Sequence, residues 1–373
     1  MKVPFFDYTE IYKSDFPIYK DSLESVLKRA DFILRDDLFI FEKKLARFIG
    51  VEYAVGVGNG TDAIWLGFYA TGIGRGDEVI LPAHTYVATA DAIWAVGATP
   101  VVVDIQDDHS ISPQAIEEAI SPRTKAIVPV NLNGRAAPLG LIADIASKNS
   151  LLVIEDNAQG IGAKLNGKSA GTFGILGTLS FYPAKILGGL GDGGAVITND
   201  YEVSEKIFRL RSHGRDRNNE VVEWGFNSRL DNLQAAVLDA KLGELEVNVS
   251  RRRQIADIYF QLLCEVEEIV LPQQYSNSTE KYFDSFQNYE IEAQNRNELR
   301  EFLSSKGVGT LVQWGGKGVH QFGLSGMVVK DVPNANRIID CMLLLPMNQY
   351  LADWQIEYVC DCIKEFYGTG KNV

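Results

Sequence analysis

Short apolar runs alternate with helical segments over the first 160 residues, and this alternation limits the possible folds more than any other feature of the chain. Helices are predicted at 19–30, 37–49, 62–71, 88–96, 112–120 and 139–147, and strands at 53–57, 78–81, 100–104, 126–130 and 151–154. Strands that are apolar throughout are typical of a parallel sheet buried on both faces. We therefore expect an α/β fold with a mostly parallel central sheet flanked by helices.

Polar residues follow several of these strands directly. They are 58–62, 84–86, 131–134 and Asp156. In open parallel sheets ligands bind beyond the carboxyl ends of the strands, so these residues are expected to meet at one rim.

The segment 180–195 (Ser-Phe-Tyr-Pro-Ala-Lys-Ile-Leu-Gly-Gly-Leu-Gly-Asp-Gly-Gly-Ala) combines a serine, a lysine and a glycine run. A lysine in a glycine-rich loop is usually just solvated, but Lys185 lies between strands predicted at 178–181 and 195–198. Glycines let the backbone approach a cofactor closely, and burial would lower the pKa of the lysine, as an imine-forming amine requires.

Asp156 ends the apolar run 151–155. It could be an ordinary helix N-cap, or it could pair with a protonated ring nitrogen. Pyridoxal 5'-phosphate is the cofactor that these residues favour together. Lys185 can form a Schiff base with its aldehyde, Ser180 can lie near its phosphate, and Asp156 stands at a strand end. Gln159 is then a candidate hydrogen-bond donor to the ring, and Tyr86 a candidate for stacking on it.

The turn Gly56-Val-Gly-Asn-Gly-Thr61 invites a dinucleotide interpretation. Thr61 stands where the third glycine of the fingerprint belongs, and Glu78 begins its strand instead of ending it, which argues against a Rossmann-type oxidoreductase. The turn opens a helix, whose N–H groups can hold a phosphate. Gly60, Thr61 and Ser180 are therefore predicted to form a phosphate site.

Composition excludes several classes of protein. The net charge of −13 provides no overall basic surface for nucleic acid. The four cysteines lack CxxC spacing and no His-Cys cluster resembles a zinc site, so no metal is expected and reduced thiols are predicted. No signal-peptide layout and no run of about 18 apolar residues occurs, so we expect no membrane association and a cytoplasmic location.

The pattern changes near residue 235. A long helix is predicted over 234–260, followed by a strand at 288–291, a helix at 296–305, a strand at 310–312 and a helix at 352–366. We predict a large cofactor-binding domain with N-terminal helices over 1–240 and a smaller α+β domain over 241–373.

Over nearly its whole length the chain resembles the DegT/DnrJ/StrS group of sugar aminotransferases, which have fold type I of the pyridoxal-phosphate enzymes, the fold of the aspartate-aminotransferase superfamily. The motifs that carry the resemblance are Gly58-Asn-Gly-Thr-Asp-Ala63, Glu155-Asp-Asn-Ala-Gln159, Ser180-Phe-Tyr-Pro-Ala-Lys185, Gly191-Asp-Gly-Gly194 and Gly225-Phe-Asn-Ser-Arg-Leu-Asp-Asn-Leu-Gln-Ala235.

The resemblance implies a role for each matching residue. Lys185 would hold the cofactor as a Schiff base and, with Asp156 on the ring nitrogen, carry the catalysis, while Gln159 would bond the ring hydroxyl and Tyr86 would stack on the ring. Gly60, Thr61 and Ser180 would bind the phosphate, joined by Asn227 from the neighbouring subunit of a homodimer with shared active sites. The implied activity is a ping-pong transfer of an amino group from L-glutamate to a keto sugar.

The acceptor side departs from the family pattern. Family members often carry histidines within 130–135, within 285–289 and at the position of Asn348. The family favours a nucleotide-linked keto-deoxy sugar, and the departures favour a free keto sugar acid, such as an oxidised 3-deoxy-octulosonate of lipopolysaccharide. A non-catalytic regulatory protein of the same fold is the other class left open. The candidates for contacting the acceptor, otherwise ordinary loop residues, are Arg135, Gln313, Trp314, Lys317 and His320.

Overall fold

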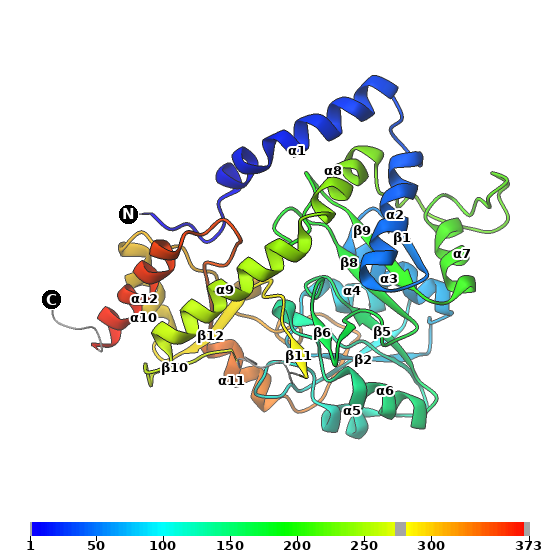
Figure 1. Ribbon diagram of the computed structural model, residues 1–373. Coiled ribbons are helices and arrows are strands. Elements are labelled where there is room, and N and C mark those ends of the chain that lie inside the picture. Colours follow the sequence, from blue (N-terminus) through cyan, green and yellow to red (C-terminus); the bar gives the residue numbers. More distant parts are fainter. Residues whose placement is uncertain (1, 273–280, 369–373) are drawn as a thin grey trace.

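The computed structural model describes residues 2–272 and 281–368, and a large mixed sheet forms its centre (Figure 1). Along the chain the strands of this sheet are β1 (Tyr53–Val57), β2 (Glu78–Pro82), β3 (Thr99–Val103), β4 (Thr124–Ile127), β5 (Leu152–Asp156), β8 (Leu176–Ser180), β9 (Gly194–Thr198) and β13 (Val328–Val329). Their order across the sheet is β1-β9-β8-β5-β4-β2-β3-β13. Neighbouring strands from β8 to β13 are parallel, whereas β9 is antiparallel to both β8 and β1.

Helices cover both faces of this sheet. Along the chain the α-helices of the described residues, including those that pack on a second sheet, are α1 (Tyr8–Arg29), α2 (Asp36–Ile49), α3 (Gly60–Thr71), α4 (Val87–Ala95), α5 (Pro113–Ala119), α6 (Leu139–Lys148), α7 (Tyr201–Leu210), α8 (Asn232–Leu242), α9 (Leu245–Leu263), α10 (Arg296–Ser305), α11 (Pro333–Cys341) and α12 (Asp353–Tyr367).

Successive residues of a strand belong to different layers of the core. Val79 and Leu81 of β2 pack in the layer of α3, α4 and α7, whereas Ile80 packs in the layer of α5 and α6. Because side chains alternate along a strand, one apolar run fills both layers. The predicted α/β fold with a mostly parallel sheet flanked by helices is confirmed.

The last third of the described chain adds a second, antiparallel sheet, β10-β12-β14, formed by Ile269–Val270, Tyr289–Ala293 and Met342–Leu345. Residues of α9, α10 and α12 pack around it in one buried cluster, which Val3 also joins. A small third sheet, β11-β6-β7, consists of three two-residue strands: β6 (Lys164–Leu165), β7 (Lys168–Ser169) and β11 (Tyr282–Phe283). The division into domains at residue 240 stays a proposal.

Three predicted elements differ in the structure. The helix predicted over 234–260 is two helices, α8 and α9, because the chain leaves helical geometry at Glu244 after the weak helix former Gly243. The predicted strand 310–312 is wrong: Leu311 alone pairs, with Leu344, before the chain turns at Trp314 with a φ of 51°. Helix α1 begins at Tyr8, well before the predicted residue 19, and contains Pro17.

No helix within residues 2–272 or 281–368 combines the length and apolarity that crossing a lipid bilayer requires.

Candidate active site

A cavity of about 880 Å³ lies where β2, β5 and β8 end. The residues that the sequence assigned to a cofactor and that line this cavity are Gly60, Thr61, Tyr86, Asp156, Gln159, Ser180 and Lys185. The expected meeting of strand-end residues at one rim therefore occurs.

Lys185 is held in the loop between β8 and β9. The side-chain amide of Gln287 forms hydrogen bonds with the backbone on both sides of this lysine. Its Nε2 donates to the carbonyl of Ala184 at 2.9 Å, and its Oε1 accepts from the N–H of Ile186 at 3.0 Å. Burial disfavours the charged ammonium and lowers the pKa of Lys185 to about 8, although Asp156 opposes this shift. Roughly a tenth of the amine is therefore neutral and nucleophilic at pH 7, and about half of it at pH 8.

Asp156 is the last residue of β5 and is buried. Its Oδ2 accepts a hydrogen bond of 2.7 Å from the Thr89 hydroxyl, and its Oδ1 accepts from the N–H of Ala158 at 3.2 Å. Burial raises the pKa of Asp156, while the Thr89 hydroxyl, the Ala158 N–H and Lys185 act in the opposite direction. A cationic ring nitrogen beside this carboxylate would stabilise its ionised form further.

The N-terminus of α3 forms part of the wall of the cavity. Asn59 caps this helix by accepting the N–H of Asp62 at 2.8 Å. A side chain could not replace the hydrogen at Gly60, since a Cβ there would lie 2.8 Å from the Cβ of Ser180. This close approach brings the Ser180 hydroxyl to the free N–H groups and positive end of the helix, an arrangement that suits a phosphate.

Gln159 has a fixed amide orientation. Its Oε1 accepts the backbone N–H of Asn133 at 2.9 Å and the Nδ2 of Asn288 at 3.3 Å. With the oxygen engaged in this way, the Nε2 group is left to donate to a ring oxygen.

Gln313 and Trp314, two of the predicted acceptor residues, also line the cavity. The Nε2 of Gln313 donates to Asn133 at 3.1 Å and to the buried Glu290. The Trp314 ring lies 6.3 Å from the Tyr86 ring, centroid to centroid, and Tyr86 is half exposed. Two aromatic rings therefore flank the open side of the cavity.

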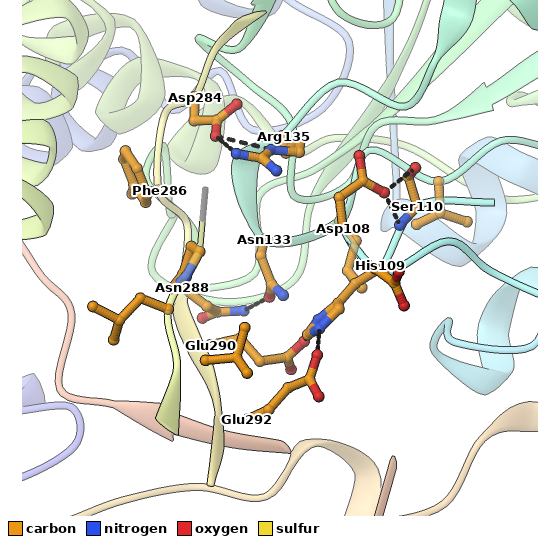
Figure 2. A pocket seen from close by; sticks show the side chains of 16 residues that line it. Asp108, His109, Ser110, Asn133, Arg135, Asp284, Phe286, Asn288, Glu290 and Glu292 are labelled. Carbon is orange, nitrogen blue, oxygen red and sulfur yellow. Dashed lines mark hydrogen bonds and ion pairs between the residues drawn. The ribbon is translucent and has the colours of Figure 1, made fainter. Parts of the chain in front are cut away.

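The other predicted residues lie elsewhere. Arg135 forms an ion pair of 2.6 Å with Asp284 in a second pocket (Figure 2). Lys317 is exposed, and His320 lies 2.9 Å from Asn336, so neither is among the described residues that line the cavity. Asn227 pairs through its backbone with Ser212, and its reach into a neighbouring subunit stays a prediction.

Sequence reasoning missed the residues that orient the predicted ones. Thr89 holds Asp156, Gln287 holds the Lys185 loop, and Asn133 and Asn288 hold Gln159. Thr89 follows the predicted rim turn by one helical turn, and Asn133 belongs to the polar stretch 131–134 that the sequence placed at the rim without a role. Gln287 and Asn288 come from a loop more than 100 residues further along the chain and match no spacing motif.

Pyridoxal 5'-phosphate fits these residues. A lysine whose pKa burial lowers, a buried carboxylate and a helix N-terminus line one cavity, and the missing side chain at Gly60 leaves the phosphate end open.

Solved structures have the same fold. A DegT DnrJ EryC1 StrS aminotransferase from Brucella abortus superimposes with a TM-score of 0.93 at 34% identity, covering 98% of this chain and 100% of that one. A Bacillus subtilis protein, NtdA, solved with its cofactor PMP bound, gives a TM-score of 0.89 at 30% identity, covering 98% of this chain and 85% of that one.

Two curated relatives are similar over most of the chain. A pleiotropic regulatory protein of Geobacillus stearothermophilus is 40% identical, with 98% of this chain and 99% of the relative covered. The UDP-2-acetamido-2-deoxy-3-oxo-D-glucuronate aminotransferase of Pseudomonas aeruginosa is 38% identical, with 91% and 93% covered.

The model of the DegT/DnrJ/EryC1/StrS aminotransferase family matches residues 19–364, which is most of the sequence. The protein is therefore an enzyme that depends on pyridoxal phosphate and belongs to the DegT/DnrJ/EryC1/StrS aminotransferase family.

Proposed function

We propose that the enzyme transfers the amino group of L-glutamate to the keto group of a nucleotide-linked deoxy sugar. The observation that carries the proposal is the meeting of Lys185, Asp156 and the N-terminus of α3 in one cavity that extends beyond them to Gln313 and Trp314. The 3-oxo UDP-sugar in the name of the Pseudomonas relative supports carbon 3 as the position aminated.

When bound, the cofactor supplies an electron-withdrawing ring that stabilises negative charge on the carbon beside the reacting amine. The chain's own part in proton transfer belongs to Lys185. With a pKa of about 8, Nζ can take a proton from the α carbon of the donor and deliver it to the cofactor carbon that takes up the amino nitrogen, which completes the first half-reaction.

The remaining residues hold the reacting centre in place. Asp156, supported by Thr89, keeps the ring nitrogen protonated. Gln159 donates a hydrogen bond from its Nε2 to the oxygen on the cofactor ring, since Asn133 and Asn288 engage only its Oε1. The N-terminus of α3 and the hydroxyls of Thr61 and Ser180 bind the phosphate.

The cavity supports a nucleotide-linked acceptor better than a free sugar acid. A free sugar acid needs a cationic partner for its carboxylate. Arg135, the candidate partner for that carboxylate, is paired with Asp284. The Trp314 ring, which also lines the cavity, offers a surface for stacking on the base of a nucleotide, while Tyr86 stays the candidate for the cofactor ring.

The homodimer with Asn227 shared across subunits and the cytoplasmic location belong to the same proposal. The four cysteines, Cys264, Cys341, Cys360 and Cys362, are unpaired, which supports a reducing compartment.

An acceptor screen tests the proposal. The purified holoenzyme is given L-glutamate with either a UDP- or dTDP-linked 3-keto sugar or a free keto sugar acid, and 2-oxoglutarate release is measured. We expect release with a nucleotide-linked sugar and none with the acid, and Lys185→Ala serves as the inactive control. Release with the acid alone would favour the other acceptor. No conversion of the cofactor by glutamate or any other amino donor would favour the regulatory alternative.

A further inference from the structure

Three side chains of metal-ligating type converge outside the cofactor cavity. His84 Nε2 lies 3.2 Å from Glu290 Oε1, and His109 Nδ1 lies 2.6 Å from the same oxygen. All three atoms lie within 4.8 Å of one another. His84 follows β2, His109 follows β3 and Glu290 is on β12, so three separate elements supply the set.

The chemistry of the set suits a divalent transition metal. Two imidazoles and one carboxylate are the protein ligands of many three-residue zinc sites, in which a water completes a tetrahedron. Bonds of about 2.0–2.2 Å put neighbouring ligand atoms roughly 3.3 Å apart. The His84–Glu290 separation of 3.2 Å already has about this value, the His109–Glu290 separation of 2.6 Å is shorter, and the two histidine nitrogens lie within 4.8 Å of each other.

Both His109 and Glu290 are oriented by outer partners. His109 Nε2 lies 3.2 Å from Glu292 Oε1, and the other oxygen of Glu292 is bound by Arg337. The second oxygen of Glu290 accepts from Gln313. A carboxylate on the far nitrogen of a ligating histidine is the usual outer shell of a metal site, because it fixes the ring and leaves Nδ1 facing the metal.

A second pocket gives access to the cluster. Its volume is about 240 Å³, and His109, Glu290 and Glu292 form the part of its wall seen low in Figure 2. His109 projects toward the two glutamates (Figure 2) from a backbone with a φ of 68°, a conformation that residues other than glycine adopt uncommonly. The pocket offers both an entry path and space for the water ligand.

We propose that His84, His109 and Glu290 bind one divalent first-row transition metal ion, with zinc as the chemical type. The ion fastens β12 to the loops after β2 and β3 and, through Gln313, stiffens the wall of the cavity at the acceptor side. The proposal is independent of the acceptor and of the proposed amino transfer.

Metal binding to the holoenzyme is the direct test. The purified holoenzyme is freed of metal with a chelator, titrated with Zn²⁺ by calorimetry, and analysed for bound zinc after gel filtration. We expect one zinc per chain, with an unchanged cofactor absorbance, and visible d–d bands when Co²⁺ is used instead. A wild-type enzyme that retains no zinc would overturn the proposal. The cluster would then be a hydrogen-bonded group in which a protonated His109 bridges Glu290 and Glu292.

Matched variants locate the ion. Glu290→Gln and His109→Gln keep the size of the side chain and are expected to weaken zinc binding at least tenfold, whereas His213→Asn removes an exposed histidine and should bind as the wild type does. Cofactor absorbance and circular dichroism show whether each variant is folded. Zinc held equally well by Glu290→Gln and by His109→Gln would place the ion elsewhere, including on the cofactor, and would reject the site.

Discussion

At the scale of single residues, the reactivity of the Lys185 amine is set by the side chains and backbone around it. An exposed lysine is almost fully charged at neutral pH, and here burial brings the pKa to about 8. The loop that carries it is gripped by Gln287, which comes from a segment 100 residues away. The reactivity of the amine is therefore a property of the fold.

This pKa gives a pH prediction. In the cofactor-free enzyme the rate of covalent attachment of pyridoxal phosphate should rise about tenfold per pH unit below pH 8 and level off above it, because only the neutral amine attacks. Stopped-flow absorbance measures this rate. The same measurement with free Nα-acetyl-lysine is the control, because it shows how protonation of pyridoxal phosphate itself affects the rate. A plateau that appears only near pH 10 would mean that Lys185 is not desolvated.

Asp156 and Thr89 give a graded pair of variants. Asp156→Asn removes the charge that keeps the ring nitrogen protonated and should retain the cofactor while lowering kcat about 10³-fold. Thr89→Val removes one hydrogen bond to the same carboxylate and should cost about tenfold. Both are read from kcat and from the cofactor content after gel filtration. Equal losses in the two variants would contradict a supporting role for Thr89.

At the scale of elements, glycines end helices in two different ways. Gly243, between α8 and α9, has a right-handed φ of −62°, and an added Cβ would meet Ala240 at an ordinary 3.5 Å. Gly72 ends α3 with a φ of 76°. Gly243 weakens the helix only through its low helix propensity, and its backbone conformation is open to any residue. Gly72 adopts a left-handed conformation that favours glycine.

Substitution by alanine should therefore shift stability in opposite directions. Gly243→Ala is expected to stabilise the protein by about 0.5 kcal/mol, since it restricts the unfolded chain at a compatible backbone. Gly72→Ala is expected to cost about 1–2 kcal/mol, because a left-handed residue with a Cβ is strained. Midpoints of urea unfolding at one fixed protein concentration check the signs, and a loss of stability in Gly243→Ala would show that the break between α8 and α9 needs glycine.

The sequence predicts a site residue when the feature that identifies the residue lies close to it along the chain. Asp156, Ser180 and Lys185 are each recognisable because a strand precedes them within a few residues, and a parallel sheet brings strand ends together. Arg135 could not be judged in this way, because its partner Asp284 is 149 residues away. The same holds for His84, His109 and Glu290, which no spacing relates. The break between α8 and α9 escaped prediction because the apolar periodicity continues across Gly243, from Leu238 and Leu242 to Leu245 and Val249.

At the scale of the whole molecule, the proposed sharing of sites between subunits can be tested by mixing two inactive variants. Lys185→Ala and Asn227→Ala chains are unfolded together, refolded and assayed. If Asn227 serves the neighbouring site, each mixed dimer has one intact site, and random pairing restores up to about a quarter of the wild-type activity. Each variant refolded alone is the control. Absence of recovery in a mixture shown to contain mixed dimers would place Asn227 in its own subunit's site.

The edge of the large sheet is completed late in the chain. Val328 and Val329 of β13 pair with Val101 and Val102 of β3, more than 220 residues earlier. During synthesis on the ribosome, the hydrogen-bonding groups along that side of β3 have no strand to pair with until residue 329 emerges. A bare strand edge attracts other chains, so premature termination anywhere before this point leaves a fragment prone to aggregate.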